Sequence, residues 1–239
     1  MGSCYDRKTD AVEAEYNKRM LKTGLGKKEI SDIFPQVIEK SRQFKDTYII
    51  SKEDYLSIVS LFFKEDKEFY EKMFNNLVNE ITKSQTYLSS YWVLYSLIPL
   101  LNNTYDEIIE YFLKMVLVKD LTDMNTDPTI PAETTVNVQF INMKFQDYLY
   151  VNLINYFDAF VNTLDTNDQE MLKGIEVWRT RVFISENIKS FIDKMFTDSN
   201  FSKNWETQMN LDAFKDFLKK NQYLFKFHEL KCIFVKQYE

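Results

Sequence analysis

Residues 50–63 read ISKEDYLSIVSLFF, and their order contains the signals for the start of a helix. Ser51 is a favoured N-cap residue, and Asp54 follows three positions later, where a capping box has a glutamate or glutamine. Apolar side chains then recur at helical spacing, at Tyr55, Ile58, Val59, Phe62 and Phe63. The stretch therefore predicts a capped helix that buries one face.

Comparable apolar stripes follow one another along most of the chain. They predict helices over residues 30–38, 69–81, 88–101, 105–118, 138–164, 168–183, 188–196 and 211–218. Pro35 interrupts the first stripe, so that helix either starts near the proline or bends there. Thr104 and Glu107 form a second capping box, before the helix over 105–118. Residues 122–135 are polar and proline-containing and predict a loop.

The composition favours helices over a turn-rich β architecture. The 239 residues include only 4 glycines and 4 prolines, and 45% of them are apolar, enough for a sizeable core. This length suits one large domain or two small lobes. The formal net charge is −6 without a basic stripe, which argues against a nucleic-acid partner. Only Cys4 and Cys232 occur, which is typical of a reducing, cytoplasmic compartment.

The first residues have the pattern of an acylated N-terminus. Gly2 is a candidate for myristate and Cys4 for palmitate, and stable attachment to a membrane takes two such anchors. Asp6 stands where Ser or Thr is usual, and the alternative is an ordinary tail over residues 1–26. Membrane association is expected only with acylation, because the longest apolar run, residues 92–101, is too short to span a bilayer.

Residues 123–134, DMNTDPTIPAET, read like the calcium loop of an EF-hand. Asp123, Asn125 and Asp127 supply oxygen atoms at ligand positions 1, 3 and 5 of that loop. Ile130 falls at position 8, whose backbone joins a short β pairing with a second loop. The pattern predicts a helix-loop-helix unit around this segment.

Two departures weaken this calcium site. Pro128 replaces the glycine at which the backbone turns sharply, and Thr134 replaces the bidentate glutamate, with Glu133 one residue early. Calcium is therefore the only cofactor expected, with weak binding or none. Its candidate ligands are Asp123, Asn125, Asp127 and Glu133.

Three other stretches align with the same loop and hold fewer ligands. They are residues 43–54, 81–92 and 202–213, with Ile50 and Met209 at position 8 of the first and the last. Residues 50–55 look much like the end of an EF-hand loop and the start of its exiting helix.

The order of these parts resembles the neuronal calcium sensor and calcineurin B-like group. Residues 102–107, NNTYDE, are similar to the junction between that group's second and third hands. Residues 212–218, DAFKDFL, resemble its fourth exiting helix, and residues 221–225, NQYLF, the segment after it. The resemblance implies an all-α fold of four degenerate hands in two lobes, with an apolar end: residues 27–120, 121–225 and 226–239.

The sequence contains no constellation typical of catalysis. Its single histidine, His228, lies among aromatic residues and is interpreted as a packing residue. No phosphate-binding loop, nucleophile elbow or zinc-protease helix occurs. We therefore expect no enzymatic activity.

Aromatic residues are abundant, with 20 Phe, 15 Tyr and 3 Trp. One chain of this size can hardly bury all of them, so some are expected to line a groove that receives the apolar face of a partner's amphipathic helix. The candidates for this groove are Tyr91, Trp92, Tyr95, Tyr148 and Phe157. The segment from Tyr223 to Glu239 is expected to pack on the body, and it is a candidate to fill such a groove in cis.

These observations predict a calcium-independent adaptor or a fixed structural subunit of a larger protein assembly, in the cytoskeleton or a cilium. One alternative is a lipid-anchored, calcium-sensor-like regulator of a phosphatase, kinase or channel. The other is a helical bundle unrelated to EF-hands, which would lack β pairing of Ile50 or Ile130 with neighbouring loops.

Overall fold

The structure is a computed structural model, and the residues it describes are 30–45, 47–62, 67–81, 86–100, 103–117, 135–156, 189–190, 193 and 208–225. Their α-helices are α2 (Ile30–Lys40), α3 (Lys52–Phe62), α4 (Lys67–Ile81), α5 (Ser90–Leu97), α6 (Tyr105–Leu117), α7 (Val138–Tyr156) and α10 (Leu211–Lys220). Short 3-10 helices follow α5 and α10, namely η2 (Ile98–Leu100) and η5 (Gln222–Phe225). Strands are few and short: β1 (Arg42–Phe44), β2 (Thr47–Ser51), β3 (Tyr87–Ser89), β4 (Thr135–Asn137) and β5 (Gln208–Asn210).

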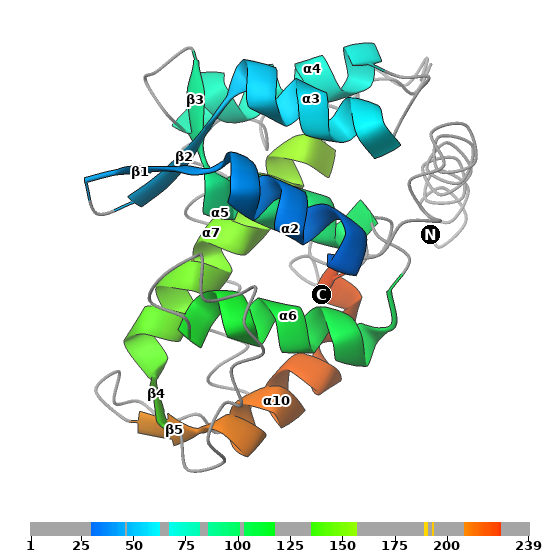
Figure 1. Cartoon of the computed structure of the whole chain (residues 1–239). Helices are drawn as coiled ribbons and strands as arrows, with labels where there is room; N and C mark the ends of the chain where they lie inside the picture. Colours follow the sequence, from blue (N-terminus) through cyan, green and yellow to red (C-terminus); the bar gives the residue numbers. More distant parts are fainter. Residues whose placement is uncertain are drawn as a thin grey trace, which may run out of the picture.

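The strands form two small antiparallel sheets on the same side of the molecule, at the left in Figure 1. The first sheet has the order β1-β2-β3, and Ile50 of β2 lies opposite Leu88 of β3. The second sheet pairs β4 with β5, and Val136 lies opposite Met209. The described residues are thus mostly helical, as the all-α expectation states, and short strands join segments that are distant in the sequence.

The N-caps predicted from the sequence are present at α3 and α6, and at α6 the bonds form the full reciprocal capping box. At α3, the Asp54 amide donates to Ser51 Oγ over 3.1 Å, and the Ser51 hydroxyl donates to Asp54 Oδ2 over 2.7 Å. At α6, the Glu107 amide donates to Thr104 Oγ1, and the Thr104 amide donates back to Glu107 Oε2 over 2.8 Å. These bonds satisfy amide groups that have no partner within the helix, so the chain enters both helices at defined residues.

Other helix boundaries differ from the expectation. The helix expected over 88–101 begins at Ser90, because residues 87–89 are extended and pair with β2. It passes into η2 at Ile98, the residue before Pro99. Pro35 lies inside α2 rather than at its start. The helix expected over 138–164 is described as α7 to Tyr156, and the one expected over 168–183 lies outside the described residues.

One continuous apolar core extends from α2 to η5. Helix α7 crosses the molecule from the second sheet toward α4 and packs against both α4 and α5 (Figure 1). Its buried Asn152 side chain donates to the Tyr95 carbonyl of α5 over 3.0 Å and to the Tyr148 carbonyl over 2.8 Å. A polar side chain fixed in this way locks α5 and α7 together, because a buried amide left without partners is costly.

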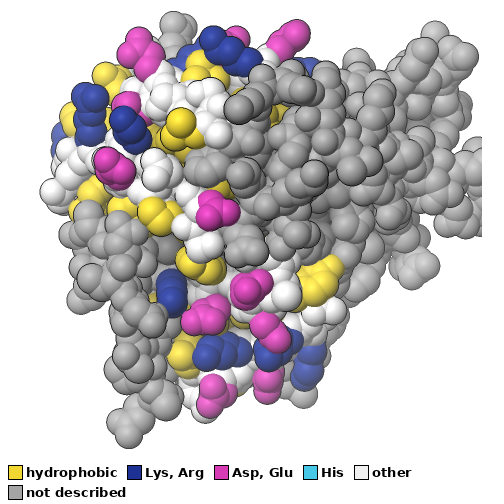
Figure 2. All heavy atoms as spheres, turned by 45° about the vertical axis from the view of Figure 1, so that its right-hand side comes forward, with side chains coloured by type: hydrophobic (Ala, Val, Ile, Leu, Met, Phe, Trp, Pro, Cys, Tyr) yellow, Lys and Arg dark blue, Asp and Glu magenta, His cyan; other side chains and the backbone are white. Residues whose placement is uncertain are grey.

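The described surface has charges of both signs. Figure 2 shows acidic and basic side chains interspersed over the lower part of the molecule, where α6 and α10 lie in Figure 1. One ion pair joins these two helices, with Lys219 Nζ 3.0 Å from Asp106 Oδ1. None of the helices in the described ranges combines the length and the hydropathy that crossing a membrane requires.

Candidate partner-binding site

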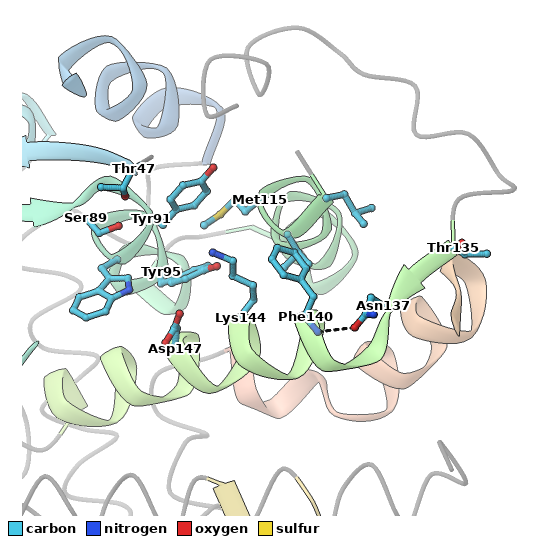
Figure 3. A pocket seen from close by; sticks show the side chains of 13 residues that line it. Thr47, Ser89, Tyr91, Tyr95, Met115, Thr135, Asn137, Phe140, Lys144 and Asp147 are labelled. Atoms are coloured by element: carbon cyan, nitrogen blue, oxygen red, sulfur yellow. Dashed lines mark hydrogen bonds between the residues drawn. The ribbon is translucent and has the colours of Figure 1, made fainter. Parts of the chain in front are cut away.

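A cavity of about 550 Å³ opens between the first sheet, α5, the end of α6 and the start of β4 and α7 (Figure 3). Aromatic and apolar side chains form much of its wall, and a smaller set of polar side chains joins them. The lining residues are Thr47, Ser89, Tyr91, Trp92, Tyr95, Met115, Val116, Leu117, Thr135, Asn137, Phe140, Lys144 and Asp147. Apolar walls with a few convergent polar groups are typical of binding sites.

Helix α7 presents one row of side chains to the cavity. Phe140, Lys144 and Asp147 follow at spacings of four and three residues, which places them on one helix face, and Figure 3 shows all three rising from α7. Asn137 fixes the start of this row, because its side-chain oxygen accepts the Phe140 amide over 3.1 Å and caps the helix. Phe140 keeps 43% of its surface exposed, which is much for a phenylalanine.

The Lys144 ammonium lies among aromatic rings. Its nitrogen is 5.1 Å from the centre of the Tyr91 ring and 5.5 Å from that of the Phe140 ring. Both distances are within the range of cation–π attraction, which partly replaces the water lost by a half-buried ammonium group. The lysine therefore links α7 to α5 across the cavity.

Asp147 and Tyr95 are the other polar groups of the wall. Burial raises the pKa of the Asp147 carboxyl, and the nearby Lys144 charge offsets that rise in part. Burial also raises the pKa of the Tyr95 phenol, and the Asp147 charge adds to the effect. Among the described residues, no lysine or arginine forms an ion pair with Asp147, and the buried Tyr95 hydroxyl has no hydrogen-bond partner.

Three of the aromatic residues predicted to bind a partner meet at this cavity. Tyr91, Trp92 and Tyr95 of α5 all line it, although Tyr95 is fully buried. The prediction for Tyr148 needs correction, because that residue is also fully buried and its hydroxyl donates to the Leu224 carbonyl over 3.1 Å. Phe157 lies outside the described residues, as do Gly2, Cys4 and His228.

Sequence reasoning missed the α7 side of the cavity. Phe140, Lys144 and Asp147 show helical spacing, which was a usable signal for a shared face. That signal could not show that the face lies opposite Tyr91 and Trp92. The packing of α7 against α5 is a contact between segments that are separated in the sequence, and a local pattern does not specify it.

The segment η5 packs on α6 and α7. Leu224 and Phe225 of η5 are fully buried. The Phe225 ring centre is 5.3 Å from that of Tyr148 and 5.4 Å from that of Phe112. The start of the segment predicted to pack on the body therefore does so, through residues 224 and 225, while residues 226–239 lie outside the described part.

The calcium loop predicted over residues 123–134 precedes the strand β4. Asp123, Asn125, Asp127 and Glu133 lie outside the described residues. The residue opposite Met209 is Val136, six residues after Ile130. Ile130 itself lies outside the described residues, so its β pairing stays a prediction.

The first of the four aligned loops folds as a hairpin. Arg42, Gln43 and Phe44 pair with Ile49, Tyr48 and Thr47, and Lys45 takes a positive φ of 54° at the turn. The Arg42 guanidinium lies 3.7 Å from the carboxylate of Asp54, the last residue of this aligned stretch. Within the described ranges, no group of three or more His, Cys, Asp or Glu side chains is placed to hold a metal ion.

Comparisons with protein-family models, with characterised proteins and with solved structures find no match for this chain. Its function must therefore be argued from its own residues.

Proposed function

We propose that this protein is a non-enzymatic, largely calcium-independent adaptor or structural subunit, built from paired EF-hand-like units, that binds other proteins through the cavity between α5 and α7. The observation that carries the proposal is the pairing of Ile50 with Leu88. These are the eighth residues of the aligned stretches 43–54 and 81–92, and the eighth residues of paired EF-hand loops face each other in the same way.

The helices around this pairing support the same interpretation. The first unit is α2, the hairpin and α3, and the second is α4, β3 and α5. Helix α2 packs against α5, and α3 packs against α4, so each helix of one unit meets a helix of the other. The pairing of β4 with β5 and the contact between α6 and α10 repeat part of this arrangement in the second half. In a helical bundle unrelated to EF-hands, β pairing between the segments that connect the helices would not be expected in both halves of the chain.

Two features favour a protein that works without calcium. The hairpin uses the backbone groups of residues 42–44 in the sheet, whereas a calcium loop wraps its backbone around the ion. Lys45 lies at the turn, and the Arg42 guanidinium lies 3.7 Å from the Asp54 carboxylate. A positive charge beside this carboxylate opposes the approach of a calcium ion.

The chemistry of the cavity favours binding over catalysis. Tyr91, Trp92 and Phe140 belong to the residue types that dominate the energy of protein interfaces. Phe225 of η5 packs against Phe112 of α6 and Tyr148 of α7, and we therefore assign the partner helix to the cavity. We place the protein in a stable assembly of the cytoskeleton or a cilium, as its sequence suggested.

Calorimetric titration of the purified protein with calcium tests this proposal, with Asp123→Ala as the matched variant. We expect no binding heat, or the same heat in both proteins, and no change of the thermal unfolding midpoint with calcium. Micromolar binding that disappears in Asp123→Ala would contradict the proposal and would support the alternative of a calcium-sensor-like regulator.

A second measurement tests the constitutive binding itself. Complexes of the native protein, isolated once with calcium and once with a chelator, should have the same composition and the same apparent mass. Trp92→Ala should release the partner in both conditions, because truncation of a central interface tryptophan typically costs 2 kcal/mol or more, on the order of a 30-fold weaker complex.

A further inference from the structure

We infer that the cavity between α5 and α7 receives an arginine side chain of the partner, with its guanidinium directed at Asp147 and Tyr95. This inference rests on the proposed function and adds the chemistry of the partner's anchoring residue. The incoming segment would be an amphipathic helix with one basic residue among apolar ones.

The Asp147 carboxylate is the anionic group of the cavity, and only the charge of Lys144, which forms no ion pair with it, offsets its burial in part. It is half-buried on α7, and in the described part of the chain no arginine or lysine lies within ion-pair distance. Burial raises its pKa, which means that the charged form is not fully compensated in the free protein. A cation from outside would compensate it, and a neutral or acidic group would not.

Tyr95 provides a second, independent observation. Its hydroxyl is buried, it has no hydrogen-bond partner among the described residues, and it points from α5 toward α7 in Figure 3. A phenolic oxygen can accept a hydrogen bond from an N–H donor. A donor that enters the cavity beside Asp147 would reach this second acceptor when the side chains that cover the Tyr95 hydroxyl move aside.

Lys144 does not fulfil this role itself. Its ammonium lies over the Tyr91 and Phe140 rings, and its nitrogen forms no ion pair with Asp147. The rings stabilise the lysine charge in part, whereas the carboxylate has no contact of this kind from an aromatic ring or an ion pair within the described residues. Lys144 repels an incoming cation. Removal of the lysine charge should therefore strengthen the binding of a cation, and the direction of this change tests the inference.

Arginine fits these features better than lysine. A guanidinium is planar, stacks on aromatic faces such as the half-buried Trp92 ring, and has five N–H donors to divide between a carboxylate and a phenol. The apolar wall from Met115 to Leu117 would pack against neighbouring apolar side chains of the partner. The net charge of −6 attracts a basic segment over longer distances.

The experiment uses the full chain and two capped amino acids of nearly the same shape, N-benzoyl-L-arginine amide and N-benzoyl-L-citrulline amide. Ligand-observed NMR measures their binding, and N-benzoyl-L-glutamate amide serves as the anionic probe. We expect the arginine probe to bind about tenfold more tightly than the citrulline probe, because only its guanidinium can pair with a carboxylate.

Three variants decide the assignment. Asp147→Asn should reduce the arginine preference to less than about twofold, whereas Asp216→Asn, an exposed residue of α10, should leave it unchanged. Lys144→Gln should strengthen binding of the arginine probe by removing a repulsive charge. Equal binding of the two probes, preference for the glutamate probe, weaker arginine binding in Lys144→Gln, or no binding of any probe would overturn the inference. None of these results would bear on the adaptor function itself. That function is tested separately by the calcium titration and by the isolation of complexes with and without calcium.

Discussion

Two buried tyrosines differ in what their hydroxyl groups contact. The Tyr148 hydroxyl donates to the Leu224 carbonyl, whereas the Tyr55 hydroxyl is buried without a hydrogen-bond partner in the described part of the chain. We expect Tyr148→Phe to lower the free energy of unfolding by about 1 kcal/mol, because it leaves a buried carbonyl unsatisfied. Tyr55→Phe should leave stability unchanged or raise it, because it removes an unpaired polar group.

Urea unfolding followed by circular dichroism measures both values. The Tyr55 variant serves as the matched control, since both substitutions remove one hydroxyl from a fully buried ring. An equal loss in the two proteins would mean that the bond to Leu224 contributes nothing.

Asp147 should make stability depend on pH. Its pKa in the folded protein is raised by burial, so the folded state holds the proton more tightly than the unfolded chain does. The protonated Asp147 side chain therefore stabilises the folded state at pH values below the pKa of aspartate in the unfolded chain. This stabilisation is lost as the pH rises through the higher pKa that Asp147 has in the folded protein. Asp147→Asn should therefore be more stable than the wild type at neutral pH, with a smaller difference near pH 4.

Thermal unfolding of both proteins across this pH range gives the comparison. Three charged or titratable groups face or adjoin the carboxyl: Lys144 on the same helix, and Tyr91 and Tyr95 on α5. Only the carboxyl titrates in the acidic range, so a difference that grows as the pH falls would contradict the assignment.

At the scale of elements, the start of α6 depends on its capping box. Thr104→Ala removes the acceptor of the Glu107 amide and the hydroxyl that donates to Glu107 Oε2 over 2.9 Å. We expect a loss of about 1 kcal/mol in the free energy of unfolding, the usual cost of an N-cap. Ser60→Ala, on the exposed face near the end of α3, is the control for loss of a hydroxyl and should change stability by less than about 0.5 kcal/mol.

The capping boxes were predictable, because both partners lie within three residues of each other. The strand β4 was not. Its partner Met209 is far along the chain from Val136, and a pattern of alternating Asp and Asn residues earlier in the loop directed the prediction to Ile130 instead. A two-stranded pairing of three residues has too little local preference to be seen in one sequence.

At the scale of the whole molecule, the η5 segment holds the second half together. The Phe225 ring contacts Phe112, Phe145 and Tyr148, which come from two helices. Phe225→Ala should lower the free energy of unfolding by about 3–5 kcal/mol, because a cavity replaces a fully buried ring. It should also raise the fluorescence of a bound hydrophobic dye.

Phe44→Ala is the matched control, since Phe44 is 55% exposed at the hairpin turn. Its cost should stay below about 1 kcal/mol. Similar losses in the two variants would mean that η5 does not stabilise the fold and that its position is incidental.

The sequence by itself determined the helices and their caps, because apolar periodicity and capping depend on residues within one or two turns. It also indicated that α5 is rich in side chains suited to binding. Only the tertiary structure decided that Tyr148 is core, that Phe140, Lys144 and Asp147 face α5, and that residues 42–44 pair with residues 47–49. The physical reason is that burial and register follow from contacts between distant segments, and a local pattern does not specify which segments meet.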